Sequence, residues 1–132
     1  MELDLAGKTA FVTGGNIGIG RAVSLALARC GADVALTYHS HEAEGKETVD
    51  AIKEMGRNAI ALQLDATNGE QVKEVVGQVA QALGGHIDIL MNNAGHLVGR
   101  CSIADMTDEH WFKTINVNLT STFSVPGQHC LL

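Results

Sequence analysis

The chain has 132 residues, a length that suits one domain with its own hydrophobic core. Hydrophobic residues make up 45% and charged residues 18%, a composition typical of globular proteins that excludes a disordered segment. The formal net charge of −6 leaves no basic stripe that could neutralise phosphates, which excludes nucleic acid as a partner.

Three cysteines, Cys30, Cys101 and Cys130, lie far apart without a Cys-x-x-Cys pair and indicate free thiols in a reducing compartment. The N-terminal segment Met1–Asp4 lacks the basic and apolar regions of a signal peptide. No apolar run approaches the roughly 18 residues that a bilayer span requires. We therefore expect a cytoplasmic protein with no membrane partner.

Strand and helix patterns alternate with short connections, which is typical of βαβ units on a parallel sheet. Buried strands are predicted over residues 9–13, 34–38, 59–64 and 87–91. Helices are predicted from the glycine-rich turn at 13–20 to Gly31, over 41–55, from Thr67 to 84, and from Thr107 to a break at Pro126-Gly127. Thr67 and Glu70 have the spacing of a capping box at the start of the third helix.

The spacing of apolar residues predicts which side of each helix faces the core. The inward residues are Ile19, Val23, Leu27 and Cys30 in the first helix, Val49, Ile52 and Met55 in the second, Val72, Val75, Val76, Val79 and Leu83 in the third, and Trp111, Ile115 and Leu119 in the last. Each helix is therefore expected to cover one face of the sheet.

The segment Thr13–Gly20 reads Thr-Gly-Gly-Asn-Ile-Gly-Ile-Gly and runs from the first strand directly into a helix. A helix start offers unpaired N–H groups and partial positive charge, and glycines let the backbone approach phosphates. The phosphate loop of nucleoside triphosphatases needs Lys and Ser or Thr after its last glycine, whereas Arg21 and Ala22 follow here. The spacing also differs from Gly-x-Gly-x-x-Gly, but the segment predicts a turn that binds a dinucleotide diphosphate.

Thr-Gly-x-x-x-Gly-x-Gly resembles the short-chain dehydrogenase/reductase family, and three further segments match that family in the same order: Leu64–Thr67, Asn92–Gly95 and Ile115–Leu119. The nearest branch is the one similar to 3-oxoacyl-carrier-protein reductases. The resemblance implies an α/β, Rossmann-type, doubly wound parallel sheet in three layers, incomplete here, with strand order 3-2-1-4. It stops near Phe123, so we expect a dinucleotide-binding domain over 1–123, an atypical tail over 124–132, and a C-terminally truncated chain.

The resemblance also implies roles for single residues. The residues expected to bind the pyrophosphate and ribose are Gly14, Asn16, Ile17, Gly18, Ile19 and Gly20. Asp65 would accept a hydrogen bond from the adenine amino group beside the Ala66 backbone, and Asn93, Ala94 and Gly95 would lie near the adenine-side ribose. Asn118 matches a catalytic asparagine that helps to hold a proton-relay water, with a role in helix packing as the alternative.

The end of the second strand indicates which dinucleotide binds. Enzymes that use NAD commonly place an acid there for the ribose 2′-OH, but this chain has Tyr38, His39 and Ser40. Asp33 begins the strand and, at about 3.3 Å per residue, lies over ~10 Å from that end. We therefore expect NADP(H), with His39 and Ser40 near its phosphate; NAD(H) stays the alternative, because Ile17 occupies a position where many NADP-preferring relatives carry a basic residue.

The family transfers hydride between the nicotinamide and a small carbonyl or secondary alcohol, using a serine and a Tyr-x-x-x-Lys pair. Tyr38 is the one tyrosine, and position 42 holds glutamate, so the pair is absent and we expect no activity from this chain alone. The alternative is a non-catalytic module that binds the dinucleotide or pairs with a full-length relative in an oligomer. No metal is expected, because two loop histidines at 39 and 41 provide too few ligands.

Overall fold

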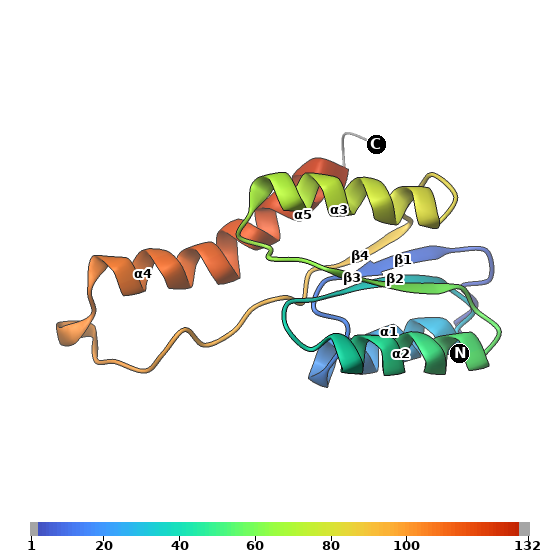
Figure 1. Ribbon diagram of the computed structural model, residues 1–132, viewed down its shortest axis with the longest axis horizontal. Coiled ribbons are helices and arrows are strands. Elements are labelled where there is room, and N and C mark those ends of the chain that lie inside the picture. Colours follow the sequence, from blue (N-terminus) through green and yellow to red (C-terminus); the bar gives the residue numbers. More distant parts are fainter. Residues whose placement is uncertain (1–2, 130–132) are drawn as a thin grey trace.

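The structure, a computed structural model, describes residues 3–129 and contains a parallel four-stranded sheet as its middle layer (Figure 1). The strands are β1 (Thr9–Val12), β2 (Asp33–Tyr38), β3 (Ala59–Gln63) and β4 (Ile89–Met91), in the order β3-β2-β1-β4. This arrangement confirms the predicted α/β class and strand order. The fourth strand is shorter than predicted, because Ile87 and Asp88 precede the ladder.

Helices cover both faces of the sheet. The helices are α1 (Gly18–Arg29) and α2 (Glu42–Glu54) on one face, and α3 (Gly69–Ala82) and α5 (Ser121–His129) on the other (Figure 1). Between β4 and α5 the chain forms a short 3₁₀ turn (Ile103–Asp105), α4 (Asp108–Ile115) and a π-helical segment (Asn116–Thr120). The result is the expected three-layer sandwich, from which α4 projects sideways. None of the helices in the described part is long and apolar enough to cross a membrane.

Two hydrophobic clusters form the core, one on each face of the sheet. Val12 and Leu36 pack with Leu25 and Ile52 under α1 and α2. On the other face, Phe11 packs with the predicted valine stripe of α3 and with Val125 of α5. The side chains of successive strand residues point to opposite faces, so Phe11 and Val12 enter different clusters.

The predicted inward face of α1 is wrong at its start. Ile19 is 75% exposed, whereas Ser24, Leu25 and Ala28 are buried against the sheet. The helix begins beyond the end of β1, so its first turn has no strand beneath it. Met55, at the far end of α2, is also exposed rather than buried, because it follows the last residue of that helix. Cys30 is half-buried.

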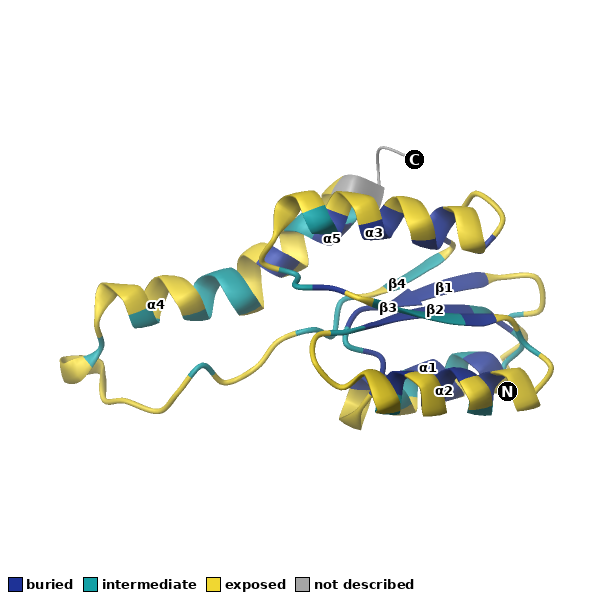
Figure 2. Ribbon diagram, viewed as in Figure 1, coloured by how far each residue is buried: buried dark blue, intermediate teal, exposed yellow. Residues whose placement is uncertain are grey.

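The predicted burial of the last helix is also wrong. Trp111 of α4 is 52% exposed and Leu119 of the π-helical segment is exposed too, whereas Ile115 is half-buried, because α4 lies beside the sandwich rather than on it (Figure 2). Pro126 does not end α5, which continues to His129. Proline removes one hydrogen bond of the helix, but Val125 is buried in the core under α3 and holds this turn in place. Cys130, Leu131 and Leu132 lie outside the described residues.

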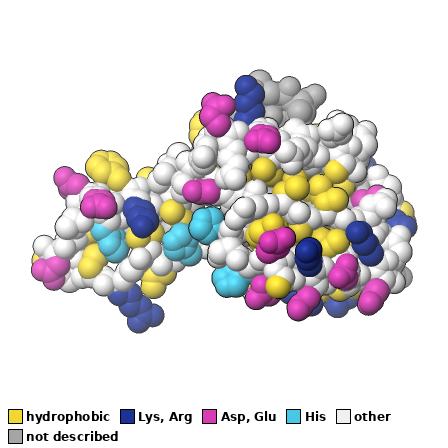
Figure 3. Space-filling model, in the orientation of Figure 1, with side chains coloured by type: hydrophobic (Ala, Val, Ile, Leu, Met, Phe, Trp, Pro, Cys, Tyr) yellow, Lys and Arg dark blue, Asp and Glu magenta, His cyan; other side chains and the backbone are white. Residues whose placement is uncertain are grey.

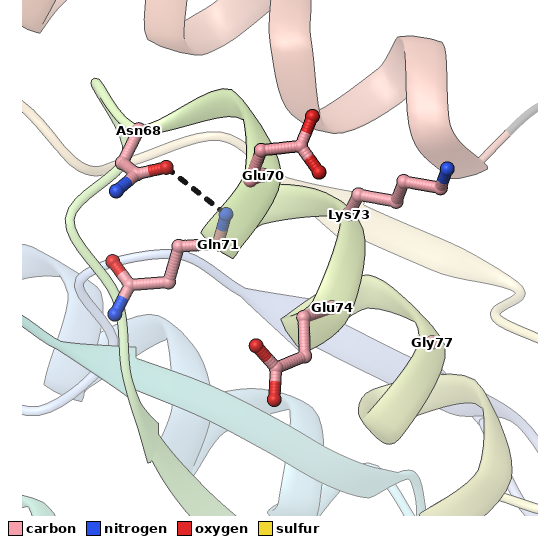
Figure 4. A pocket seen from close by; sticks show the side chains of 6 residues that line it. All are labelled: Asn68, Glu70, Gln71, Lys73, Glu74 and Gly77. Carbon is pink, nitrogen blue, oxygen red and sulfur yellow. Dashed lines mark hydrogen bonds between the residues drawn. The ribbon is translucent and has the colours of Figure 1, made fainter.

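The cap of α3 differs from the predicted capping box. Asn68, not Thr67, is the N-cap, and its side chain accepts a hydrogen bond from the Gln71 N–H (Figure 4). The Thr67 hydroxyl instead donates to the Asp65 carboxylate at 2.6 Å. The Thr67 side chain is thus turned toward Asp65, and the N-cap lies one residue later, at Asn68.

At the amino ends of β1 and β4, Asp88 accepts hydrogen bonds from the Thr9 N–H and hydroxyl. These bonds, with a smaller contribution from Lys8, hold the pKa of Asp88 below its ordinary value. A carboxyl with a depressed pKa stabilises the fold above its unfolded pKa of about 4, and this stabilisation is lost as pH falls through the folded pKa. The melting temperature should therefore fall between about pH 5 and 3, and Asp88→Asn should flatten that fall, measured by circular dichroism. Parallel curves for the two proteins would contradict this assignment.

Candidate functional site

The carboxyl ends of the strands lie along one edge of the sheet. Val12 of β1 pairs with Leu36 of β2 and with Met91 of β4, and Tyr38 pairs with Gln63 of β3. The segments that follow these strands are therefore neighbours, and they are the ones in which the sequence predicted the site: 13–20, 39–41, 64–67 and 92–95. Ligands of open parallel sheets bind at such an edge.

The glycine-rich turn opens α1 toward this edge. Gly14 and Gly18 have φ values of +63° and +53°, a region that side chains with a Cβ rarely adopt. The N-cap Ile17 makes no side-chain capping bond, and the first turn of α1 contains no acid, whereas α3 and α4 have both. The first N–H groups of α1 thus keep their hydrogen-bonding capacity and positive potential for an anion.

Asn93 holds the turn in place from the next strand. Its side-chain N–H₂ group donates to the carbonyl oxygens of Thr13 and Gly14, at 3.1 and 3.0 Å. The Thr13 hydroxyl in turn accepts the N–H groups of Asn93 and Ala94. Because these hydrogen bonds close a network between two strand ends, the turn is preorganised before any ligand arrives.

Asp65 provides a carboxylate at another wall of the site. Its Oδ1 accepts bonds from the hydroxyl and the N–H of Thr67, and these bonds lower the pKa of Asp65 below its ordinary value. The nearby His39 contributes to the same shift. The carboxyl therefore stays ionised, and Oδ2, which has no hydrogen-bond partner among the described residues, can accept a bond from a ligand's N–H group.

A cleft of about 650 Å³ lies between these segments. The predicted residues that line it are Gly14, Asn16, Ile17, Ile19, Gly20, His39, Ser40, Asp65, Ala66, Asn93, Ala94 and Gly95. On the surface, histidines gather where α4 meets the sandwich (Figure 3), and His39, His41 and His96 are cleft-lining residues. The structure thus brings together four separate segments of the sequence around one cavity.

Known proteins that resemble this chain identify its family. Residues 8–129 match the family described as short chain dehydrogenase. The chain belongs to the short-chain dehydrogenase family. The resemblance of the glycine-rich turn and the three other segments is therefore confirmed.

Individual relatives cover almost all of this chain. General stress protein 39 of Bacillus subtilis (strain 168) is 40% identical over 119 residues, which are 90% of this chain and 41% of that protein. The 2-dehydro-3-deoxy-D-gluconate 5-dehydrogenase of the same organism is 38% identical over 130 residues, 96% of this chain and 49% of that protein. A short chain dehydrogenase from Burkholderia cenocepacia J2315, solved in complex with NADP, superposes with a TM-score of 0.90 at 39% identity, covering 96% of this chain and 51% of that one. The chain spans about half the length of these relatives.

Two predicted residues of this short-chain dehydrogenase do not line the cleft. Gly18 shapes the turn through its positive φ. Asn118, in the π-helical segment, exchanges two hydrogen bonds of 3.1 Å with the backbone of His96 and also donates to the Thr114 carbonyl. A Cβ at Gly95 would lie 2.6 Å from Asn118 Oδ1, so the two segments are in close contact. Asn118 thus holds the segment after β4 in position without itself lining the cleft.

The remaining cleft residues were not predicted from the sequence: Thr37, Tyr38, His41, Leu64, Thr67, His96 and Val117. Most of them directly neighbour predicted residues at strand ends, and this position in the sequence could have predicted them. Val117 neighbours the predicted Asn118 but lies at no strand end, and the packing of the π-helical segment against the loop after β4 brings it to the cleft.

A second pocket, of about 640 Å³, lies on the polar surface of α3 (Figure 4). Its lining residues are Asn68, Glu70, Gln71, Lys73, Glu74 and Gly77, none of which was a predicted site residue. Two carboxylates and one lysine make it unfavourable for an anionic dinucleotide. No cluster of three or more His, Cys, Asp or Glu side chains that could hold a metal ion occurs among the described side chains of residues 3–127.

Proposed function

We propose that this short-chain dehydrogenase binds a nicotinamide dinucleotide in the cleft at the carboxyl edge of the sheet. The observation that carries the proposal is the uncapped start of α1, with free N–H groups on one side of the cleft and the ionised Asp65 on another. The free N–H groups of α1 suit a pyrophosphate, and the carboxylate of Asp65 suits the amino group of adenine. The residues present therefore fit the pyrophosphate and the adenine of such a dinucleotide.

We propose NADP(H) in preference to NAD(H). In the described part of the chain, Asp65 is the one acid that lines the cleft, and residues 39–41 after β2 contain no carboxylate. Asp33 begins that strand at the opposite edge, where it accepts bonds from Asn58. His39 and Ser40 are exposed beside the cleft and can donate to a phosphate. The related protein from Burkholderia cenocepacia, which was solved with NADP, supports this choice.

The reaction class that we propose is hydride transfer to or from a carbonyl or secondary alcohol, with the nicotinamide supplying or accepting the hydride. The residues of this chain bind and orient the dinucleotide, and Asn118 positions the loop beside it. The Tyr-x-x-x-Lys pair that protonates the substrate oxygen in this family is absent, because Tyr38 is the one tyrosine and Glu42 stands where its lysine would follow. The 132-residue chain therefore binds without turnover.

Calorimetric titration of the folded 132-residue chain tests the proposal. We expect saturable binding of both dinucleotides, with NADP⁺ tighter than NAD⁺, and no reduction of simple ketones by NADPH. A chain that is folded by circular dichroism but gives no saturable heat with either dinucleotide would reject the binding site. Tighter binding of NAD⁺ would reject the cofactor preference alone, and turnover above background would show that an acid is present.

A second function is favoured by the apolar surface of α4 and the following helical segments. Trp111, Phe112, Leu119 and Phe123 are all exposed there. Exposed aromatic patches of this kind mark protein interfaces. A non-catalytic chain that pairs with a full-length relative through this surface would change that relative's activity when added in excess, whereas a cofactor-binding half alone would not.

A further inference from the structure

We propose that Asn16 is a positioning residue that holds the loop 39–41 and thereby sets the discrimination between NADP and NAD. The inference rests on the proposed function, because it concerns the same cleft. The resemblance implied a direct contact between Asn16 and the dinucleotide, but the side chain of Asn16 forms a hydrogen bond with the backbone of His41. It joins the glycine-rich turn to the segment that follows β2.

Asn16 is 3% exposed, and its side-chain N–H₂ group donates to the carbonyl oxygen of His41 at 3.1 Å. Its own carbonyl accepts a hydrogen bond from the hydroxyl of Thr48 at 3.2 Å. Thr48 is fully buried in α2. The His41 carbonyl also accepts the first helical bond of α2, from the N–H of Gly45. Asn16 therefore connects the phosphate-binding turn to α2 through one partly buried hydrogen bond, to His41, and one buried hydrogen bond, from Thr48.

The loop between β2 and α2 has one other anchor. The carbonyl of His39 accepts a bond from the side chain of Gln63, which is exposed, so water competes with that bond. The side chains of His39 and Ser40 are exposed between the two anchors. The bond of Asn16, which is better shielded from water than that of Gln63, is therefore the one that sets the distance between these side chains and the glycine-rich turn.

This distance matters for one of the two dinucleotides. A 2′-phosphate can bond His39 or Ser40 only while the pyrophosphate of the same molecule lies on the glycine-rich turn. Without the Asn16 bond, the loop 39–41 is free to move away from the turn, and the contact with the phosphate weakens. NAD⁺ lacks that phosphate, so its affinity depends much less on the position of the loop.

The experiment compares three variants of the 132-residue chain by calorimetric titration with NADP⁺ and NAD⁺. Asn16→Leu keeps the branched shape of the side chain but removes the donor, and Thr48→Val removes the hydroxyl that bonds the same segment. Thr9→Val is the matched control, because it removes a hydroxyl of a buried threonine that makes a partly buried hydrogen bond at the opposite edge of the sheet. We expect the ratio of the NAD⁺ to the NADP⁺ dissociation constant to fall roughly tenfold in Asn16→Leu, about the effect of one charge-assisted hydrogen bond. It should fall less in Thr48→Val and stay constant in Thr9→Val.

A purely structural role would lower the melting temperature in all three variants without changing the ratio. If the wild-type chain discriminates and Asn16→Leu keeps the ratio within about twofold, the inference is wrong while the proposed function stands. Should Asn16→Leu fail to fold, an unchanged ratio in Thr48→Val overturns it equally. A wild-type chain that binds both dinucleotides with equal affinity overturns the inference and the preference for NADP, and one that binds neither rejects the cleft itself.

Discussion

Gly20→Ala is expected to destabilise the chain by about 2–3 kcal/mol and to abolish measurable binding of the dinucleotide. A Cβ at position 20 would overlap the carbonyl oxygen of Gly14 and would lie 2.5 Å from the Nδ2 atom of Asn93. Neither group can retreat, because the Asn93 amide bonds the carbonyls of Thr13 and Gly14 and so closes the turn. Accommodating the methyl group requires α1 to move away from the site that its N–H groups form.

The measurements are a thermal melt and a calorimetric titration with NADP⁺. We expect the melting temperature to fall by about 10 °C. Gly77→Ala is the matched control, since a Cβ there has no atom within 4 Å on the exposed side of α3. That variant should gain about 0.5–1 kcal/mol from helix propensity and should bind as the wild type does. Equal stability of the two variants would contradict the close packing at Gly20.

Tyr38→Asp is expected to reverse the preference for the dinucleotide. Tyr38 is the last residue of β2 and lines the cleft, so an aspartate there places a negative charge beside the expected position of the 2′-phosphate. Opposed like charges cost several kcal/mol, and we expect the affinity for NADP⁺ to fall by about 100-fold relative to NAD⁺. The same carboxylate can accept a hydrogen bond from the 2′-OH of NAD⁺.

Tyr38→Asn separates the charge from the loss of the ring. Tyr38 packs against α2, where a Cβ at Gly45 would lie 3.1 Å from its Cδ1 atom, so both variants lose this packing. The asparagine variant should weaken both dinucleotides alike and leave their ratio close to that of the wild type. Equal ratios in the aspartate and asparagine variants, measured by titration, would show that the 2′-phosphate does not lie near β2.

Local sequence patterns were sufficient to predict the sheet, and the family resemblance predicted most of the residues that line the cleft. Parallel strands begin at the same edge and end at the same edge, so the order of strands and helices along the chain already places 13–20, 39–41, 64–67 and 92–95 together. The glycines of the turn carry their own backbone requirement, because only glycine adopts positive φ at low cost, as Gly14 and Gly18 do.

The sequence patterns did not predict where contacts in the folded chain override a local preference. Thr67 has the spacing of an N-cap, but its hydroxyl donates to Asp65, and Asn68 caps α3 instead. Pro126 would end an isolated helix, but burial of Val125 between α3 and the sheet keeps α5 continuous. Ile19 has the spacing of a core residue, yet no strand lies beneath the first turn of α1.

The sequence alone thus predicted the class of fold, the glycine-rich turn and the segments that line the cleft. These features depend on periodicity, chirality and backbone freedom within a few residues. The contacts of Asn16 with His41, and of Asn118 with His96, depend on the folded chain, because each joins segments more than 20 residues apart. Such hydrogen bonds form only once the sheet has brought the segments together, and their energies decide which side chains bind a ligand and which hold the site in shape.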